Sequence, residues 1–397
     1  MTLKDYTAAV EPSIYEVFCQ LHRNPELAMQ EYNTCALIEK ELREKTKVDS
    51  IQHIGETGLL VELKGTNSGQ ARCIGLRGDM DALPIQEAAG HQVRSQVDGL
   101  MHACGHDVHT SILLGAVRIL ENYRSQISGS VLFFFQPGEE PLVGAKTFVE
   151  SPLVDLKRLD GIAACHVLPD LEVGQVGIRR GPMLAGSNGL YIIIKGRQGH
   201  SSKPNEAIDP ITPAIAIIPA LQELITKELH PADPAVISIH SIHCGDETVK
   251  VVPGELRMAG SIKTLSPEAR TFLLKRIPEV CEGIAKSMRC EAEVKITDGP
   301  PPLIIDDAWA DRAFRVCRRL LGEENVFPIE RPSMCSEDFS YLKENTPGVF
   351  VRLGSSTPGA PYGPTHNPNF CADRGTLTTG MLTLTGLALD FFDIDYN

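Results

Sequence analysis

The segment MHACGHDVH, at residues 101–109, holds a dense group of side chains that could bind a metal ion. It contains His102, Cys104, His106, Asp107 and His109. Cys104 and His106 can point to the same side of an extended segment, and a thiolate beside an imidazole suits Zn²⁺ or a similar transition metal. A loop of solvated histidines around a buried thiol is the alternative. The density of ligand-type residues favours a metal site.

Acidic residues follow two predicted strands. Asp79 and Asp81 come directly after an apolar run that ends at Leu76, and Glu139 and Glu140 follow the run VLFFF. Open α/β sheets place their ligand crevices at such strand ends. Two adjacent carboxylates can divide their work, because one can bind a metal while its neighbour acts as a base. Taken alone, each pair is also compatible with an acidic turn or a helix cap.

Three single histidines are further candidates. His166 follows the apolar run 162–165, His366 lies in the turn-rich segment GPTHNP, and His200 lies in GRQGHSS. A lone histidine is more often a hydrogen-bonded structural residue than a ligand. These three histidines are therefore candidates for a functional site only in combination with the groups above.

The elements that must position these residues alternate between helices and strands. Residues 5–22 carry apolar side chains at spacings of four, three and four, which predicts an amphipathic helix. Near-continuous apolar runs at 131–135 and 162–165 are typical of strands covered on both faces, and a helix-like segment at 111–123 lies between the first of them and an earlier apolar run at 73–76. This order predicts an α/β fold with a central mixed sheet between helices.

The order of predicted elements changes in the middle of the chain. The predicted elements from 190 to 296 run strand, helix, strand, strand, helix, strand, which is the order of a ferredoxin-like α+β unit. The linker-like stretch DGPPP comes next. We therefore predict a catalytic α/β domain formed by residues 1–182 and 299–397, interrupted by a smaller ferredoxin-like insert at 183–298.

Composition narrows the class of protein. The chain has 397 residues, about two and a half times a usual domain of roughly 150, so two or three domains are expected. A net charge of −13 without basic stripes disfavours nucleic-acid binding. No export signal or membrane span is visible, and no two of the eleven cysteines are closer than Cys281 and Cys290. Such spacing suits reduced thiols, so we expect a cytoplasmic protein with no membrane partner.

Seven motifs in chain order carry a resemblance to a known family: LRGDMDALP, MHACGHDVH, FQPGEE, CHV, GRQGHSS, SEDF and THNPNF. With them the chain resembles the di-metal aminoacylase and carboxypeptidase family. Within that family it is most similar to the amidohydrolase branch, which includes hippurate hydrolase and auxin-conjugate hydrolases. The resemblance extends over nearly the whole chain, from LHRNPEL to Gly380.

The resemblance implies two divalent metal ions per subunit, with Zn or Mn expected first and Co or Ni open. The implied ligands are Cys104, His106, Glu140, His166 and His366. Cys104 would bridge the two ions, and Glu139 would be the general base. Asp81 would act from behind the ligands, while Asp79 stands where other branches keep a histidine ligand.

The insert is expected, by the same resemblance, to act as a lid or dimerisation domain. His200 would stabilise the oxyanion, reaching the metals from a partner subunit or from the same chain's closed cleft. A homodimer through the insert is therefore possible. Two departures from the family pattern, Lys250 and Lys263, put the amino-acid half of the substrate in doubt, because Lys lacks the bidentate fork of Arg. A third departure, Cys335, has no physical explanation.

The predicted activity is hydrolysis of the amide bond of a small N-acyl amino acid, giving a carboxylic acid and an amino acid. Two rival functions remain. A dipeptidase or carboxypeptidase of the same family would act on a substrate with a free α-amine. A metal-binding protein that has lost catalysis is disfavoured, because the base Glu139 and a complete ligand set are retained.

Overall fold

The computed structural model describes residues 1–247, 250–360 and 363–396, and its contacts divide the chain into two compact units. The first unit comprises residues 1–181, 305–331 and 338–397, and the second comprises 182–304 and 332–337. The short segment 332–337 belongs to the second unit through backbone hydrogen bonds. Ser333 N donates to Met183 O at 2.9 Å, and Ala185 N donates to Cys335 O at 2.8 Å.

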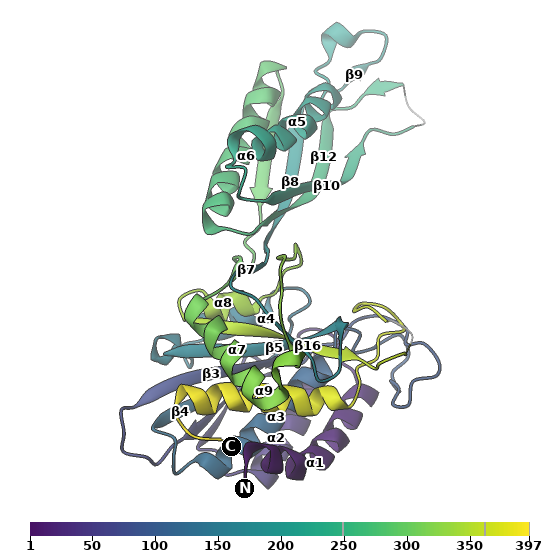
Figure 1. Ribbon diagram of the computed structural model, residues 1–397. Coiled ribbons are helices and arrows are strands. Elements are labelled where there is room, and N and C mark those ends of the chain that lie inside the picture. The colour runs from purple at the N-terminus through teal and green to yellow at the C-terminus, as the bar shows by residue number, and fades with distance from the viewer. Residues whose placement is uncertain (248–249, 361–362, 397) are drawn as a thin grey trace. The chain divides into compact units, whose positions relative to one another are not determined.

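An eight-stranded mixed sheet organises the first unit, in the order β1-β2-β4-β3-β5-β16-β6-β15. Strands β3, β4, β5 and β16 of this sheet are labelled in Figure 1. Its strands are β1 (Ser50–Ile54), β2 (Gly58–Lys64), β3 (Arg72–Asp79), β4 (Gly129–Gln136), β5 (Gly161–Glu172), β6 (Val176–Ile178), β15 (Val326–Pro328) and β16 (Gly348–Ser356). Neighbours β4, β3, β5 and β16 run parallel, while β1 and β2 are antiparallel. The predicted α/β fold with a mixed sheet is confirmed.

The helices of this unit cover the sheet and each other. They are α1 (Leu3–Arg23), α2 (Tyr32–Lys45), α3 (His106–Leu120), α4 (Gly144–Glu150), α7 (Asp307–Leu321), α8 (Phe339–Lys343) and α9 (Gly375–Phe391). Helix α3 packs between α1 and α9, and every one of its residues is buried. The apolar runs predicted as covered strands are fully buried, as Phe133 and Ile162 in β4 and β5 illustrate. Burial of apolar surface on both faces is what holds these strands in the centre.

Short elements connect the larger ones. Single-turn helices occupy Glu121–Tyr123, Leu156–Arg158, Pro204–Glu206 and Glu323–Asn325, and short strands occupy β7 (Gly181–Leu184) and β14 (Leu303–Ile305). No helix among the described residues is long and apolar enough to cross a membrane.

The second unit is an antiparallel four-stranded sheet in the order β10-β12-β8-β13. Its elements run β8 (Gly186–Lys195), α5 (Ile211–Glu223), β10 (Ala235–Cys244), β12 (Glu255–Thr264), α6 (Pro267–Ser287) and β13 (Glu291–Ile296). Alternate residues of β8, such as Leu190 and Ile192, are buried in a core shared with both helices. A small two-stranded sheet joins β9 (Gly199–His200) to β11 (Val251–Val252), and a π-helical turn at Leu224–Glu228 follows α5.

Candidate metal centre

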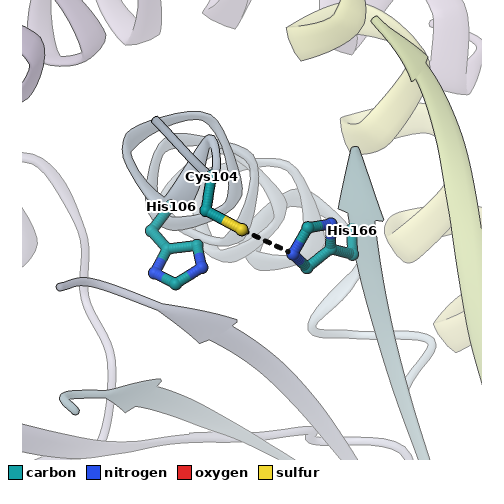
Figure 2. A group of neighbouring side chains, drawn as sticks. All are labelled: Cys104, His106 and His166. Carbon is teal, nitrogen blue, oxygen red and sulfur yellow. Dashed lines mark hydrogen bonds between the residues drawn. The ribbon is translucent and has the colours of Figure 1, made fainter. Parts of the chain in front are cut away.

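Three parallel strands bring the candidate ligands together. Strands β3, β4 and β5 are neighbours, and the segments after their carboxyl ends carry Asp81, the Glu139–Glu140 pair and, within β5, His166. Cys104 precedes α3 and His106 begins it, and Figure 2 shows the Cys104 sulfur pointing toward His166, with the His106 ring beside Cys104 at the same helix start. His366, in left-handed conformation at φ 61°, is tied to this loop because its N–H donates to Ala103 O at 2.8 Å.

The five predicted ligands lie close together. Cys104 Sγ is 3.4 Å from His166 Nε2 and 3.3 Å from His366 Nε2. Glu140 Oε1 is 3.3 Å from His366 Nε2 and 4.0 Å from His106 Nε2. The ligand atoms of Cys104, His106 and His166 lie within 4.8 Å of one another, and so do those of Cys104, Glu140 and His366. The two groups share Cys104, which is the arrangement that a bridging thiolate requires.

The chemistry of these atoms fits divalent cations. His106 Nε2 and Glu140 Oε1 are buried, and neither has a hydrogen-bond partner among the described residues. Leaving such atoms without a hydrogen bond in a protein interior costs free energy, which metal coordination would offset. Thiolate, imidazole and carboxylate together form a donor set for Zn²⁺ or a related ion.

Protonation states agree with this interpretation. Burial raises the pKa of Cys104 to about 12, so its thiolate form requires a cation beside it. Burial, together with Arg352, lowers the pKa of His166 and keeps its ring neutral. His166 Nδ1 lies 2.8 Å from Val167 O and donates to it, which directs the lone pair of Nε2 toward Cys104.

Asp81 connects one ligand to the predicted base. Its Oδ1 lies 3.1 Å from His106 Nδ1 and accepts from Glu139 N at 3.0 Å, while Oδ2 accepts from Glu140 N at 3.0 Å. These three contacts engage both oxygens of the Asp81 carboxylate. The carboxylate orients His106 and fixes the backbone of the Glu139–Glu140 pair.

His109 and Asp79 form a separate pair behind the ligands. His109 Nδ1 lies 2.6 Å from Asp79 Oδ1, and His109 Nε2 accepts from Val167 N at 2.9 Å. Both ring nitrogens of His109 are therefore used, which leaves it no lone pair for a metal. Burial alone would raise the pKa of Asp79, but Arg77 and His106 hold it well below its usual range.

The other two candidates of the MHACGHDVH segment also fall outside the ligand set. Asp107 Oδ2 lies 2.6 Å from His22 Nδ1, and the other nitrogen of His22 lies 3.2 Å from Glu87. His102 is buried, and its ring nitrogens have no hydrogen-bond partner within the described ranges. Of the five candidate side chains in this segment, the structure brings Cys104 and His106 into the metal centre.

His200 lies in the second unit, on β9, where its side chain is exposed. Its Nδ1 accepts a hydrogen bond from Ser202 N at 3.1 Å and lies 2.7 Å from Ser202 Oγ. In the neutral ring the proton then resides on Nε2. His200 thus presents an N–H donor at its free end.

Sequence reasoning missed the buried network that supports the loop after β4. Arg77 Nε donates to Gln136 Oε1 at 2.9 Å, and Gln136 Nε2 donates to Asp338 Oδ1 at 2.7 Å. Asp338 Oδ2 also accepts from Ala145 N at 2.9 Å. The motifs FQPGEE and SEDF contain Gln136 and Asp338, so a signal was present, but neither residue type pointed to its partner.

Comparison with known proteins identifies the family. Residues 75–390 match the family described as Peptidase family M20/M25/M40. The chain belongs to this family. An N-acetylcysteine deacetylase of Bacillus subtilis is 35% identical over 370 residues, covering 93% of this chain and 94% of that protein. An IAA-amino acid hydrolase ILR1-like 2 of Arabidopsis thaliana is 34% identical over 376 residues, covering 94% and 83%.

Solved structures agree with this assignment. The YXEP protein of Bacillus subtilis, described as a dinuclear metal binding peptidase from the M20 family, matches with a TM-score of 0.82 and 32% identity, covering 98% of this chain and 100% of that chain. A putative aminohydrolase of Staphylococcus aureus matches with a TM-score of 0.91 and 27% identity, covering 98% and 99%. The predicted class, a metal-dependent hydrolase of linear amides, is confirmed.

Proposed function

We propose that this M20 enzyme hydrolyses the amide bond of N-acyl amino acids, with Glu139 as its general base. The observation that supports the proposal most is the contrast between two adjacent carboxylates. Glu140 Oε1 lies 3.3 Å from His366 Nε2 and falls in one possible ligand group with Cys104, whereas Glu139 Oε2 lies 3.9 Å from His106 Nε2 and the Glu139 backbone is held by Asp81. One carboxylate can then bind a metal while its neighbour acts as the base.

Two divalent ions would be held by Cys104, His106, Glu140, His166 and His366. When bound, such a pair lowers the pKa of a shared water from about 15.7 toward 7 and polarises the scissile carbonyl. The Glu139 carboxylate accepts the proton that the water loses and passes it to the amine nitrogen that leaves. We propose Zn²⁺ or Mn²⁺ as the native ions, since the thiolate of Cys104 favours Zn²⁺ while availability leaves Mn²⁺, Co²⁺ and Ni²⁺ open.

His200 is proposed to stabilise the charge on the carbonyl oxygen. Ser202 occupies its Nδ1, so Nε2–H is the donor available to an oxyanion. In the same unit, Lys263 donates to Ser336 Oγ at 2.8 Å, and burial lowers its pKa. We propose that this ammonium holds the carboxylate of the amino-acid half, as a point charge rather than a bidentate fork.

A homodimer through the second unit is part of the proposal. Strand β10 lies at the edge of its sheet and has no strand pairing on one side among the described residues. It carries no Lys, Glu, Asp or Pro, which are the residues that usually protect such an edge, and Val236 and Ile242 are exposed on it. A cytoplasmic location is proposed because all eleven cysteines are free thiols.

A dipeptidase or carboxypeptidase activity is the alternative, since a thermostable carboxypeptidase 2 of Saccharolobus solfataricus is 31% identical over 394 residues. Assaying N-acetyl-, N-benzoyl- and indoleacetyl-amino acids against dipeptides, with metal content measured on the same sample, separates the two. We expect turnover of acylated substrates and little of dipeptides. Preference for a free α-amine would favour the alternative.

The assignment of the base is tested by Glu139→Gln. This substitution leaves all five ligands in place and removes the proton acceptor, so metal content should stay unchanged while kcat falls at least about 10²- to 10⁴-fold. Near-normal kcat with metals bound would show that another group is the base.

A further inference from the structure

Glu31 is a fully buried carboxylate with no part in the metal centre or in the proposed proton transfer. It precedes α2 as the N-cap residue, but its side chain makes no capping hydrogen bond, and its exposed fraction is 0%. Glu26 takes over the capping, accepting from Asn33 N at 3.1 Å and Thr34 N at 2.8 Å. Because the Glu31 carboxylate is buried and does not cap the helix that it precedes, its burial needs another explanation.

The Glu31 side chain reaches a distant loop instead. Its Oε1 accepts from Gly138 N at 2.8 Å and from Met29 N at 2.9 Å. Its Oε2 accepts from Thr57 Oγ1 at 2.8 Å, and Thr57 is also buried. Both carboxylate oxygens therefore act as acceptors, toward partners that come from three separate segments of the chain.

Gly138 directly precedes the proposed base, so the hydrogen bond from Gly138 N to Glu31 acts on the backbone next to Glu139. Glu31 accepts the N–H of Gly138, and Asp81 accepts the N–H groups of Glu139 and Glu140. Three successive backbone amides are thus held by two buried carboxylates: Glu31 holds the first, and Asp81 holds the second and third. Removing Glu31 frees the amide that directly precedes the proposed base.

The turn at Gly138 is also tied sterically to the Glu31 segment. Gly138 has a φ of 59°, and a Cβ built on it would lie 2.6 Å from Met29 Sδ. Met29 itself has a φ of 61°, a conformation that is unfavourable for its residue type. The hydrogen bond from Met29 N to Glu31 helps to hold this conformation, so the loop before Glu139 and the segment before α2 form one packed unit.

We propose that Glu31 is a positioning residue, which sets the place of the Glu139 carboxylate through the backbone of Gly138. The inference rests on the proposed role of Glu139 as the base. Burial raises the pKa of Glu31, and the hydrogen bonds from Thr57 and Gly138 act in the opposite direction. A carboxylate accepts at both oxygens, whereas the amide of Gln places a donor against Thr57 or against Gly138.

The test compares two substitutions of the same kind in neighbouring positions. Glu31→Gln disturbs the loop before Glu139, while Glu26→Gln disturbs only the cap of α2, and both lower stability. We expect Glu31→Gln to retain both metals and a nearly unchanged KM, with kcat reduced about 10- to 100-fold, as for a catalytic group displaced by a fraction of an ångström to 1 Å. Glu26→Gln should keep kcat.

Thr57 provides a second test, which also holds if Glu31→Gln does not fold. Thr57→Val removes the hydroxyl that donates to Glu31 Oε2 and leaves the loop before Glu139 unaltered in sequence, so kcat should fall. Thr57→Ser keeps a hydroxyl at this position and should keep kcat near the wild-type value. Unchanged kcat in Thr57→Val would overturn the proposal, as would an equal loss of kcat in the Glu31 and Glu26 variants, or a loss that follows metal content. If Glu139→Gln is inactive while Glu31→Gln is normal, only the inference fails. If Glu139→Gln is active, the proposed base fails first.

Discussion

Replacing Asp81 with Asn should weaken metal binding and turnover together. In the native structure Asp81 Oδ1 faces two donors, His106 Nδ1 and Glu139 N, and Oδ2 faces a third, Glu140 N. The Asn side chain keeps only one oxygen. In its better orientation this oxygen replaces Oδ1, so its NH₂ group lies against Glu140 N–H and leaves that buried donor unsatisfied.

The structure sets the size of the effect. One buried donor left without an acceptor costs about 1–3 kcal/mol, which corresponds to roughly a fivefold to 150-fold change in an equilibrium constant. A metal-bound histidine that loses its carboxylate partner loses about 10- to 100-fold in metal affinity or activity. The two estimates describe one and the same substitution and should not be added. We therefore expect metal affinity to fall by about 10- to 100-fold.

The assay is a titration of chelator-treated enzyme in buffered Zn²⁺, read by metal content and by initial rate. Asp306→Asn is the matched control, because Asp306 accepts from Lys343 Nζ at 2.7 Å and Gly348 N at 2.9 Å, away from the metal centre. The control should lose stability and keep metal affinity. Native metal affinity in the Asp81 variant would refute the reasoning that Asp81 orients His106.

Three further predictions concern other parts of the chain. Cys104→Ser should lower metal content as well as rate, because a hydroxyl is far less acidic than a thiol; full two-metal occupancy by elemental analysis would exclude Cys104 as a ligand. His200→Ala should keep both metals and KM while kcat falls about 10²- to 10³-fold. Mixing it with Glu139→Gln should restore activity if a partner subunit supplies His200, and no recovery despite subunit exchange would place its action within one chain. His22→Gln should lower stability in a pH-dependent way. Burial disfavours the charged ring of His22, but Asp107 and Glu87 outweigh burial and raise the pKa from 6.5 to about 10. The contribution of His22 to the free energy of unfolding is therefore complete below pH 6.5 and is lost progressively toward pH 10. The difference in that free energy between wild type and variant should shrink over this range, and a constant difference in urea unfolding would contradict the prediction.

The sequence contained most of what was needed for the fold and for the grouping of the ligands. Apolar strands such as VLFFF are followed at once by their functional residues, and parallel neighbours bring such strand ends together. The choice between the histidines of α3 was different. His106 and His109 are three residues apart on one helix face, so spacing alone treats them alike. Only tertiary contacts, from Asp79 and Val167 to His109, decide which ring stays free for a metal.

Glu31 illustrates a more general limit. Its principal partner, the N–H of Gly138, lies 107 positions away and belongs to the backbone, which every residue except proline provides. A side chain that binds a backbone amide places no requirement on the residue type of its partner. The contact therefore cannot be predicted from a pair of residue types in the sequence. The only local sign of this role in the sequence is that Glu stands at the N-cap of α2, where Ser, Thr, Asp or Asn is preferred. An unusual cap residue followed by a stable helix therefore signals that another group caps the helix and that the acid acts elsewhere, which here is beside the proposed base.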